Sequence, residues 1–314
     1  MACHLDIDTS RRRRDAPMHA LRARRGKCGL LWLAVSLAGT YEFPSARASD
    51  ITLDVIGPHE YELPIDFNKP WDILVQYVNG NAAGSVYNTM GQRQARGGSH
   101  TWQGMSKWVH FWKFRGIPNV GFGWELIQVE NYVLADGTNY GGLGPTISGP
   151  VVWFKPNRKS TFGMQAFMQT PSGTRDALST NYWSVNLNLV FDYEWKDFSF
   201  DGDVGTVVGA TLHETDRHSY TPGTTFYTNL RFSWKASKVA EPFFALDWQN
   251  AGGLYDHTAG NWVSDSSSRE IALGVGMMFP LTRSLTFTTR YSHSVDGRNV
   301  PETNAWFGKI IYVF

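Results

Sequence analysis

Long runs in which apolar and polar residues strictly alternate constrain the fold of this chain more than any other feature. Such runs cover residues 182–195, 226–235 and 285–292, and in 271–279 large residues alternate mostly with Ala and Gly. Alternation with a period of two indicates a β-strand with one apolar and one polar face. The runs approach the roughly 9–11 residues that a tilted strand needs to cross a membrane, whereas strands of soluble proteins average about 5–6 residues. The pattern therefore predicts strands that span a membrane.

The chain after residue 71 divides into about twelve predicted strands, near 72–80, 104–115, 118–133, 143–154, 159–170, 182–195, 197–213, 224–236, 239–250, 268–280, 284–296 and 303–314. Short connections alternate with long polar ones, the long ones being 81–103, 134–142, 171–181, 214–223, 251–267 and 297–302. Short periplasmic turns and longer external loops are typical of outer-membrane barrels. Because lipid offers no partner for an unpaired backbone group, such a sheet must close on itself. We therefore predict an all-β fold, a closed antiparallel transmembrane β-barrel with both termini in the periplasm.

Aromatic residues support this interpretation, since they make up 14% of the chain and include 13 Trp. Outer-membrane barrels carry girdles of aromatic side chains at both membrane interfaces. We expect one girdle beside the short turns, formed by Trp153, Phe154, Phe162, Trp195, Phe198, Trp234, Phe243 and Phe279.

Residues 1–48 have the three parts of a secretory signal peptide. A basic region precedes an uncharged stretch at 29–39, and Ala46-Arg47-Ala48 supplies a small-x-small cleavage site. The stretch is shorter than the roughly 20 apolar residues of a membrane-spanning helix. We expect cleavage after Ala48, with Met18 as an alternative start that would make residues 1–17 a mis-called extension.

Charge and cysteine content narrow the function of the remaining chain. Residues 1–48 hold nine of the 29 basic and four of the 28 acidic residues, which leaves 20 basic and 24 acidic residues. A net charge of about −4 does not fit a nucleic-acid-binding protein. Both cysteines, Cys3 and Cys28, lie in the leader, so we expect no disulfide in the mature chain. We find no phosphate loop or nucleotide fingerprint and expect no cofactor.

Residues 49–71 form a separate part in front of the predicted barrel, residues 72–314. Three prolines interrupt this part, and it contains the acidic and aromatic sequence His59, Glu60, Tyr61 and Glu62. One interpretation is a plug that folds into the lumen, and the other is a disordered periplasmic tail. Its apolar residues, among them Leu63 and Phe67, favour the plug.

The polar faces of the predicted strands carry charged residues that would point inward, namely Asp192, Glu194, Asp201, Asp203, Arg231, Lys235 and Arg290. Opposite charges across a lumen give a pore modest selectivity. The alternative is a network of salt bridges that fills a narrow barrel, because twelve strands enclose less space than the 16–18 strands of porins. Both interpretations remain open.

The predicted external loops are rich in rings, with Tyr140, Tyr220, Tyr255, His257 and Trp262. These rings either collect an aromatic ligand by stacking or pack on one another.

Two arrangements in the sequence partly resemble reactive or metal sites. His293 and Ser294 resemble the His and Ser of outer-membrane lipid hydrolases, but adjacent residues on a strand face opposite sides and cannot act together. His213 and His218 flank a loop with Glu214 and Asp216, which is a weak metal pattern. We therefore expect neither an enzyme nor a metal site.

The C-terminal strand ends as outer-membrane barrels do, with an aromatic residue preceded by alternating apolar ones. Ile310, Tyr312 and Phe314 fit this pattern. The similarity implies that the barrel-assembly machinery recognises these residues.

Several stretches resemble a family of predicted outer-membrane barrels named after the meta-pathway of phenol degradation. They are Gly142-Leu143-Gly144, Gly149-Pro150 with 153–157, 170–173 and 181–183. The resemblance covers roughly residues 140–295 and implies a role in passing or sensing aromatic compounds. Pro145 departs from the acidic residue usual after Gly-Leu-Gly in that family.

Together these features predict an outer-membrane channel, embedded in lipid, that takes up small hydrophobic or aromatic solutes. The alternatives are a structural or adhesive barrel with a filled lumen and an outer-membrane lipid hydrolase.

Deletion of Phe314 is expected to lower the amount of folded barrel in the outer membrane, because the predicted assembly signal loses its terminal aromatic ring. The measurement is the fraction of protein that migrates faster on gels without heating. An unchanged fraction would contradict the assigned signal.

Overall fold

The computed structural model describes residues 55–135, 138–175, 178, 180–213 and 219–314. The predicted signal peptide (1–48) and residues 49–54 of the predicted plug lie outside this described part. Within it, no helix has the length and apolarity needed to cross a membrane.

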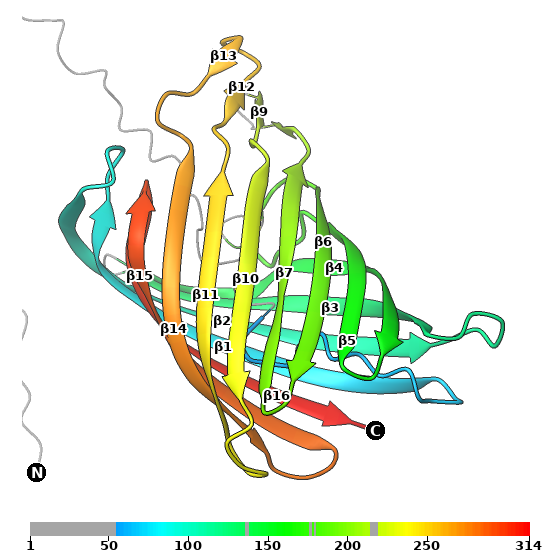
Figure 1. Ribbon diagram of the computed structural model, residues 1–314. Coiled ribbons are helices and arrows are strands. Elements are labelled where there is room, and N and C mark those ends of the chain that lie inside the picture. The colour runs from blue at the N-terminus through cyan, green and yellow to red at the C-terminus, as the bar shows by residue number, and fades with distance from the viewer. Residues whose placement is uncertain (1–54, 136–137, 176–177, 179, 214–218) are drawn as a thin grey trace, which may run out of the picture. The chain divides into compact units, whose positions relative to one another are not determined.

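Twelve strands form one closed antiparallel barrel, which confirms the predicted fold (Figure 1). They are β1 (Trp71–Tyr87), β2 (Arg93–Trp112), β3 (Val120–Ala135), β4 (Thr138–Asn157), β5 (Ser160–Gln169), β6 (Ser184–Trp195), β7 (Phe198–Gly209), β10 (Thr225–Trp234), β11 (Glu241–Ala251), β14 (Ser268–Pro280), β15 (Leu285–Arg298) and β16 (Val300–Val313). Each strand pairs with its neighbour in the sequence, and β1 pairs with β16 to close the ring.

Four short strands form a second sheet in the connections that follow β7 and β11. They are β8 (Leu212–His213), β9 (Ser219–Thr221), β12 (Tyr255–Asp256) and β13 (Asn261–Trp262), in the order β13-β12-β9-β8. Figure 1 shows β9, β12 and β13 beyond the ends of the barrel strands.

Three of the predicted long loops are wrong, because the strands on both sides continue through them. β1 and β2 pair as far as Tyr87 and Arg93, so the predicted loop 81–103 contains only a tight turn. The predicted loop 134–142 is mostly strand, and the predicted loop 297–302 shrinks to a turn at Asn299, which has a φ of 54°. Where a strand extends beyond the bilayer, water contacts both faces, so no apolar alternation marks it in the sequence.

The outer face of the barrel is apolar, as a membrane-spanning wall requires. On β6, the predicted outward residues Val185, Leu187, Leu189 and Tyr193 are exposed, while Asn188 and Asp192 between them are buried inside the barrel. Most of the predicted interfacial aromatics also lie outside, but Trp153 and Phe243 are wrong, because their side chains are buried in the interior.

Leu187→Arg is expected to lower the free energy of unfolding by about 2–4 kcal/mol, because an outward residue near mid-membrane must then hold a charge in lipid. The side chain of Leu187 is 45% exposed on the outer face. Chemical unfolding of the protein in lipid vesicles measures the change, with Asn186→Arg on the inward face as the matched control. A change near zero for Leu187→Arg would contradict the assigned outer face.

Candidate functional site

The barrel interior is occupied by residues 55–67, here called the luminal segment. Val55 and Ile56 are fully buried, and Ile56 packs among inward side chains of β1, β2, β3 and β16. At Gly57, a Cβ atom would lie 2.5 Å from Cγ2 of Thr288 on β15, so only glycine allows this close approach.

Two arginines hold the start of the luminal segment. Arg231 on β10 and Arg290 on β15 both donate hydrogen bonds to the backbone carbonyl of Val55. Both also bind Asp247 on β11, with Nη1 to carboxylate distances of 2.7 Å for Arg231 and 3.0 Å for Arg290. Two buried guanidinium groups thus share one carboxylate and one carbonyl, which give each of them an ionic and a hydrogen-bond partner.

Glu60 joins the luminal segment to the strands at the seam of the barrel. Its carboxylate binds Lys309 on β16, accepts a hydrogen bond of 2.7 Å from the Tyr77 hydroxyl on β1, and lies 3.7 Å from Nζ of Lys107 on β2. Burial disfavours the ionised form of Glu60, but Lys309 and Lys107 outweigh this effect and lower its pKa. Lys107 is also 3.4 Å from Glu125 on β3, so the ion pairs form a chain across three strands.

Two carboxylates of β7 also bind the luminal segment. Asp201 accepts a hydrogen bond of 3.2 Å from the backbone N–H of Glu60, and Asp203 accepts one of 3.3 Å from the Tyr61 hydroxyl. Both side chains are fully buried. The segment is therefore held through backbone and side-chain groups alike.

His59 lies in a group of acidic side chains at the end of the barrel where the short turns are. Its Nε2 is 2.8 Å from Glu241 at the start of β11, and its Nδ1 is 3.2 Å from Glu62 and 3.7 Å from Asp192 on β6. Burial disfavours the charged imidazole, but the hydrogen bonds with Asp192, Glu241 and Glu62 outweigh it and raise the pKa of His59 to about 12. A φ of 57° places His59 in the left-handed region, which costs a residue with a side chain roughly 1–3 kcal/mol.

The lumen has a largely apolar side, which also carries the ion pairs of Lys107, Glu125 and Lys309, and a polar side. Strands β1 to β4 and β16 contribute a buried surface, here called the apolar wall, made of Val75, Tyr77, Met105, Val109, Phe111, Ile127, Val129, Val151, Trp153, Ala305 and Phe307. The buried side chains of β6, β7, β10, β11, β14 and β15 are mostly polar or charged. Leu63 and Phe67 of the luminal segment pack against the apolar wall, and the Trp153 indole donates a hydrogen bond of 3.1 Å to the carbonyl of Pro64.

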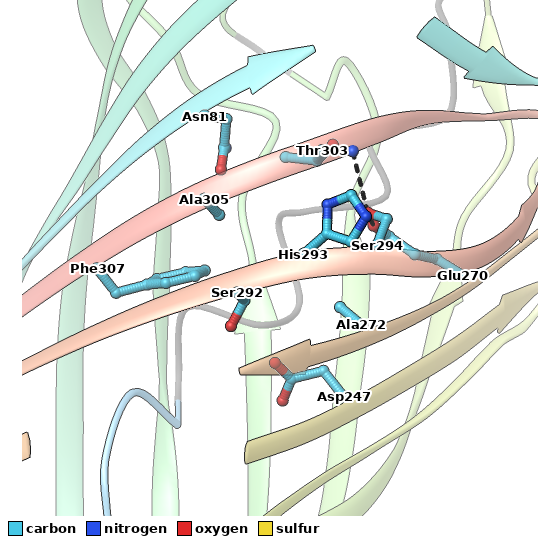
Figure 2. A pocket seen from close by; sticks show the side chains of 10 residues that line it. All are labelled: Asn81, Asp247, Glu270, Ala272, Ser292, His293, Ser294, Thr303, Ala305 and Phe307. Carbon is cyan, nitrogen blue, oxygen red and sulfur yellow. Dashed lines mark hydrogen bonds between the residues drawn. The ribbon is translucent and has the colours of Figure 1, made fainter. Parts of the chain in front are cut away.

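A small cavity of about 20 Å³ lies among side chains that include Asp247 on β11, Glu270 on β14 and Ser294 on β15 (Figure 2). Its volume holds about one water molecule. In the cavity wall Ser294 donates a hydrogen bond to Glu270 and accepts one of 3.1 Å from the backbone N–H of Thr303. His293 instead has its Nδ1 3.0 Å from Asn304 and its Nε2 3.7 Å from Glu302. Ser294 is thus bonded to Glu270, while His293 faces Asn304 and Glu302.

Of the residues predicted to line the lumen, Asp192, Asp201, Asp203, Arg231 and Arg290 are buried inside the barrel, whereas Lys235 and Glu194 are partly exposed and form an ion pair of 2.8 Å. Their role as a pore lining stays a prediction. Ile310, Tyr312 and Phe314 share the outward face of the last strand and its end, and their recognition during assembly stays a prediction.

The external rings pack on one another in part. Tyr255 makes edge contacts with His257 and Trp262 at centroid distances of 5.0 and 5.2 Å. Of the weak metal pattern, Glu214, Asp216 and His218 lie outside the described residues, as does the side chain of His213.

Sequence reasoning missed Asp247, Glu241 and the apolar wall. Asp247 and Glu241 alternate with Phe244, Leu246 and other apolar residues on β11, so the same alternation could have found them. The apolar wall is harder to find, because strands such as β2 are apolar on the lipid face and on the lumen face, with Trp108 outside and Val109 and Phe111 inside. A nearly continuous apolar run is the signal of a strand buried on both faces.

Glu60→Gln is expected to loosen the luminal segment, because Lys309 then stays buried without its counter-charge. Breaking a buried ion pair from one side costs about 3–5 kcal/mol, or at least two orders of magnitude in the docking equilibrium. The measurement is the thiol-labelling rate of Ile56→Cys in a protein whose Cys3 and Cys28 are replaced by serine. Labelling accelerates in Glu60→Gln and stays constant in the control Asp66→Asn, whose side chain is exposed; equal rates would contradict the role of Glu60.

The chain is similar to several solved structures. The COG4313 outer membrane channel from Pseudomonas putida F1 is similar at 14% identity, with a TM-score of 0.74, over 82% of this chain and 100% of that chain. The β domain of the Bordetella autotransporter BrkA matches at 10% identity and a TM-score of 0.47, over 79% of this chain and 100% of that one. The CymD monoaromatic hydrocarbon channel matches at 8% identity and a TM-score of 0.45, over 83% of this chain and 98% of that one.

The closed barrel and its apolar outer face show that the chain is an outer-membrane β-barrel. No curated protein sequence matches it significantly. A family model described as "Putative MetA-pathway of phenol degradation" matches residues 83–308, well over half of the sequence. This chain therefore belongs to that family.

Proposed function

We propose that this protein is a channel for the uptake of small hydrophobic or aromatic molecules, and that residues 49–71 are its plug. The observation that carries the proposal is the apolar wall beneath the luminal segment. Inward apolar and aromatic side chains of five strands are covered by Ile56, Leu63 and Phe67. A water-filled pore has no need of such a surface, whereas an apolar solute gains roughly 25 cal/mol per Å² of apolar area removed from water.

The plug can leave this surface without a large penalty in the interactions that it breaks. Most of its anchors are hydrogen bonds and ion pairs from Arg231, Arg290, Lys309, Asp201 and Asp203. Water entering the lumen can replace these polar contacts, so each contributes only a modest net free energy. Withdrawal of the segment would expose the apolar wall, and solute would then diffuse along it.

The charged side of the lumen would serve chiefly to hold the plug. Arg231 and Arg290 share Asp247 and the carbonyl of Val55, so both interior cations have partners while the segment is docked. This arrangement supports the filled-lumen interpretation for the closed state. The same residues would line the open channel beside the apolar wall.

Two further observations support transport of aromatic compounds over the alternatives. The family is described by a pathway of phenol degradation, and the similar Pseudomonas protein is named as an outer membrane channel. Ser294 donates its hydroxyl proton to Glu270 rather than to His293, which argues against a Ser–His hydrolase. Passage of solute and recognition by the assembly machinery are both part of this proposal.

Removal of residues 49–70 is expected to give larger and steadier single-channel openings than the intact barrel shows in planar bilayers. Benzoate should then reduce the current, because its ring binds the apolar wall, whereas acetate at the same concentration should not. Silence of both forms, from protein shown to be folded by its gel mobility, would contradict a channel.

Matched variants test the apolar wall itself. In the shortened protein, Trp153→Ala should weaken the block by benzoate roughly threefold to tenfold, the loss expected for one aromatic contact. Trp102→Ala removes an outward-facing ring and should leave the block unchanged. Equal effects of the two substitutions would contradict binding at the wall.

A further inference from the structure

His59 of the luminal segment and two carboxylates of β6 form an arrangement that suits a metal ion. Ligand atoms of His59, Asp192 and Glu194 all lie within 4.8 Å of one another. Tetrahedral coordination at about 2.0–2.2 Å separates ligand atoms by roughly 3.3–3.5 Å, so modest side-chain rotations would close the site. Glu62, whose carboxylate is 3.2 Å from His59 Nδ1, is available as a fourth ligand.

The two ring nitrogens of His59 have different neighbours. Nδ1 faces Asp192 and Glu62, whereas Nε2 is 2.8 Å from Glu241, which also accepts a hydrogen bond from Ser233. Metal-binding histidines commonly donate the second ring N–H to a carboxylate, which fixes the ring and raises its basicity. Nδ1 would be the ligand atom, with the ion replacing its proton, and Glu241 would orient the ring.

The surroundings carry more negative than positive groups. Five carboxylates gather here, those of Glu62, Asp192, Glu194, Asp201 and Glu241, against four cations, His59, Lys235, Lys155 beside Glu62 and Arg231 beside Asp201. Asp201 pairs with Asp192 across β6 and β7 and is fully buried. Within the described part of the chain, its Oδ1 atom has no hydrogen-bond partner. Buried like charges are costly unless a counter-ion compensates them, and a divalent cation would do so.

We propose that His59, Asp192 and Glu194, with Glu62, bind a divalent transition-metal ion of the Zn²⁺ class. Mixed nitrogen and carboxylate ligands favour such an ion over Ca²⁺ or Mg²⁺, which prefer oxygen ligands alone. The side chains of Glu62 and Glu194 are 40% and 21% exposed, so the ion can enter from the periplasmic end. Two of the ligands, His59 and Glu62, belong to the luminal segment and two belong to β6. The ion would therefore hold the luminal segment against β6.

Metal binding and docking of the luminal segment in the barrel are therefore thermodynamically linked. An ion that binds only when the segment is docked stabilises the docked form by mass action. This site adds a function to the barrel that does not depend on which solute crosses it. The experiment that tests metal binding and the experiment that tests solute passage can therefore give a positive or a negative result independently.

The test is calorimetric titration of Zn²⁺ into the metal-stripped full-length protein, purified in detergent without a histidine tag. We expect one ion bound per chain. His59→Gln and Asp192→Asn should abolish binding, and Glu241→Gln should weaken it roughly 10- to 100-fold, as loss of an orienting carboxylate does. His110→Gln is the matched control. His110 lies on another part of the barrel, 2.9 Å from Asp72, and among the ion pairs of the described residues it faces no second carboxylate.

A second measurement guards against misfolded variants. Zn²⁺ should slow the thiol labelling of Ile56→Cys in the otherwise unchanged barrel, and Glu194→Gln, which alters a partly exposed group, should remove this effect. Ca²⁺ at the same concentration should have little effect. Absence of binding up to about 1 mM, binding that survives His59→Gln, or labelling that ignores Zn²⁺ would each overturn the proposal.

Discussion

Backbone hydrogen bonding in lipid is the constraint on which the rest of this structure depends. No strand of a membrane-spanning sheet can leave its N–H and C=O groups unpaired, so β1 must meet β16. Closure at twelve strands then determines the width of the lumen. That width admits one extended segment of chain and little more, which is why residues 55–67 contact side chains of strands all around the ring.

The two sides of the barrel interior contribute differently to binding of the luminal segment. The apolar wall buries Ile56, Leu63 and Phe67 and supplies a nonspecific attraction that follows area. The charged side supplies direction, because hydrogen bonds from Arg231 and Arg290 to one carbonyl admit one position of the segment. Polar contacts thus determine the position of the luminal segment, and apolar contacts supply its nonspecific attraction to the barrel.

Much of the fold could be predicted, because lipid imposes a pattern on neighbouring residues. Leu187 and Asn188 differ in polarity since one faces lipid and the other faces the lumen, and all twelve barrel strands follow from such pairs. The extensions of β1 and β2 could not be predicted, because they extend beyond the bilayer and their residues therefore do not alternate between apolar and polar. The group around His59 could not be predicted either. Its members lie on β6, β11 and the luminal segment, and only closure of the barrel brings them together.

Glu60 binds Tyr77 on the first strand and Lys309 on the last, and these two strands form the seam of the barrel. The carboxylate has both partners only when the ring is shut. Insertion of the N-terminus and sealing of the seam are therefore coupled steps of biogenesis, each making the other more favourable. A nascent barrel that seals around an empty lumen would leave Lys309 without its anion, so closure of the seam is more favourable once the N-terminal segment is in place.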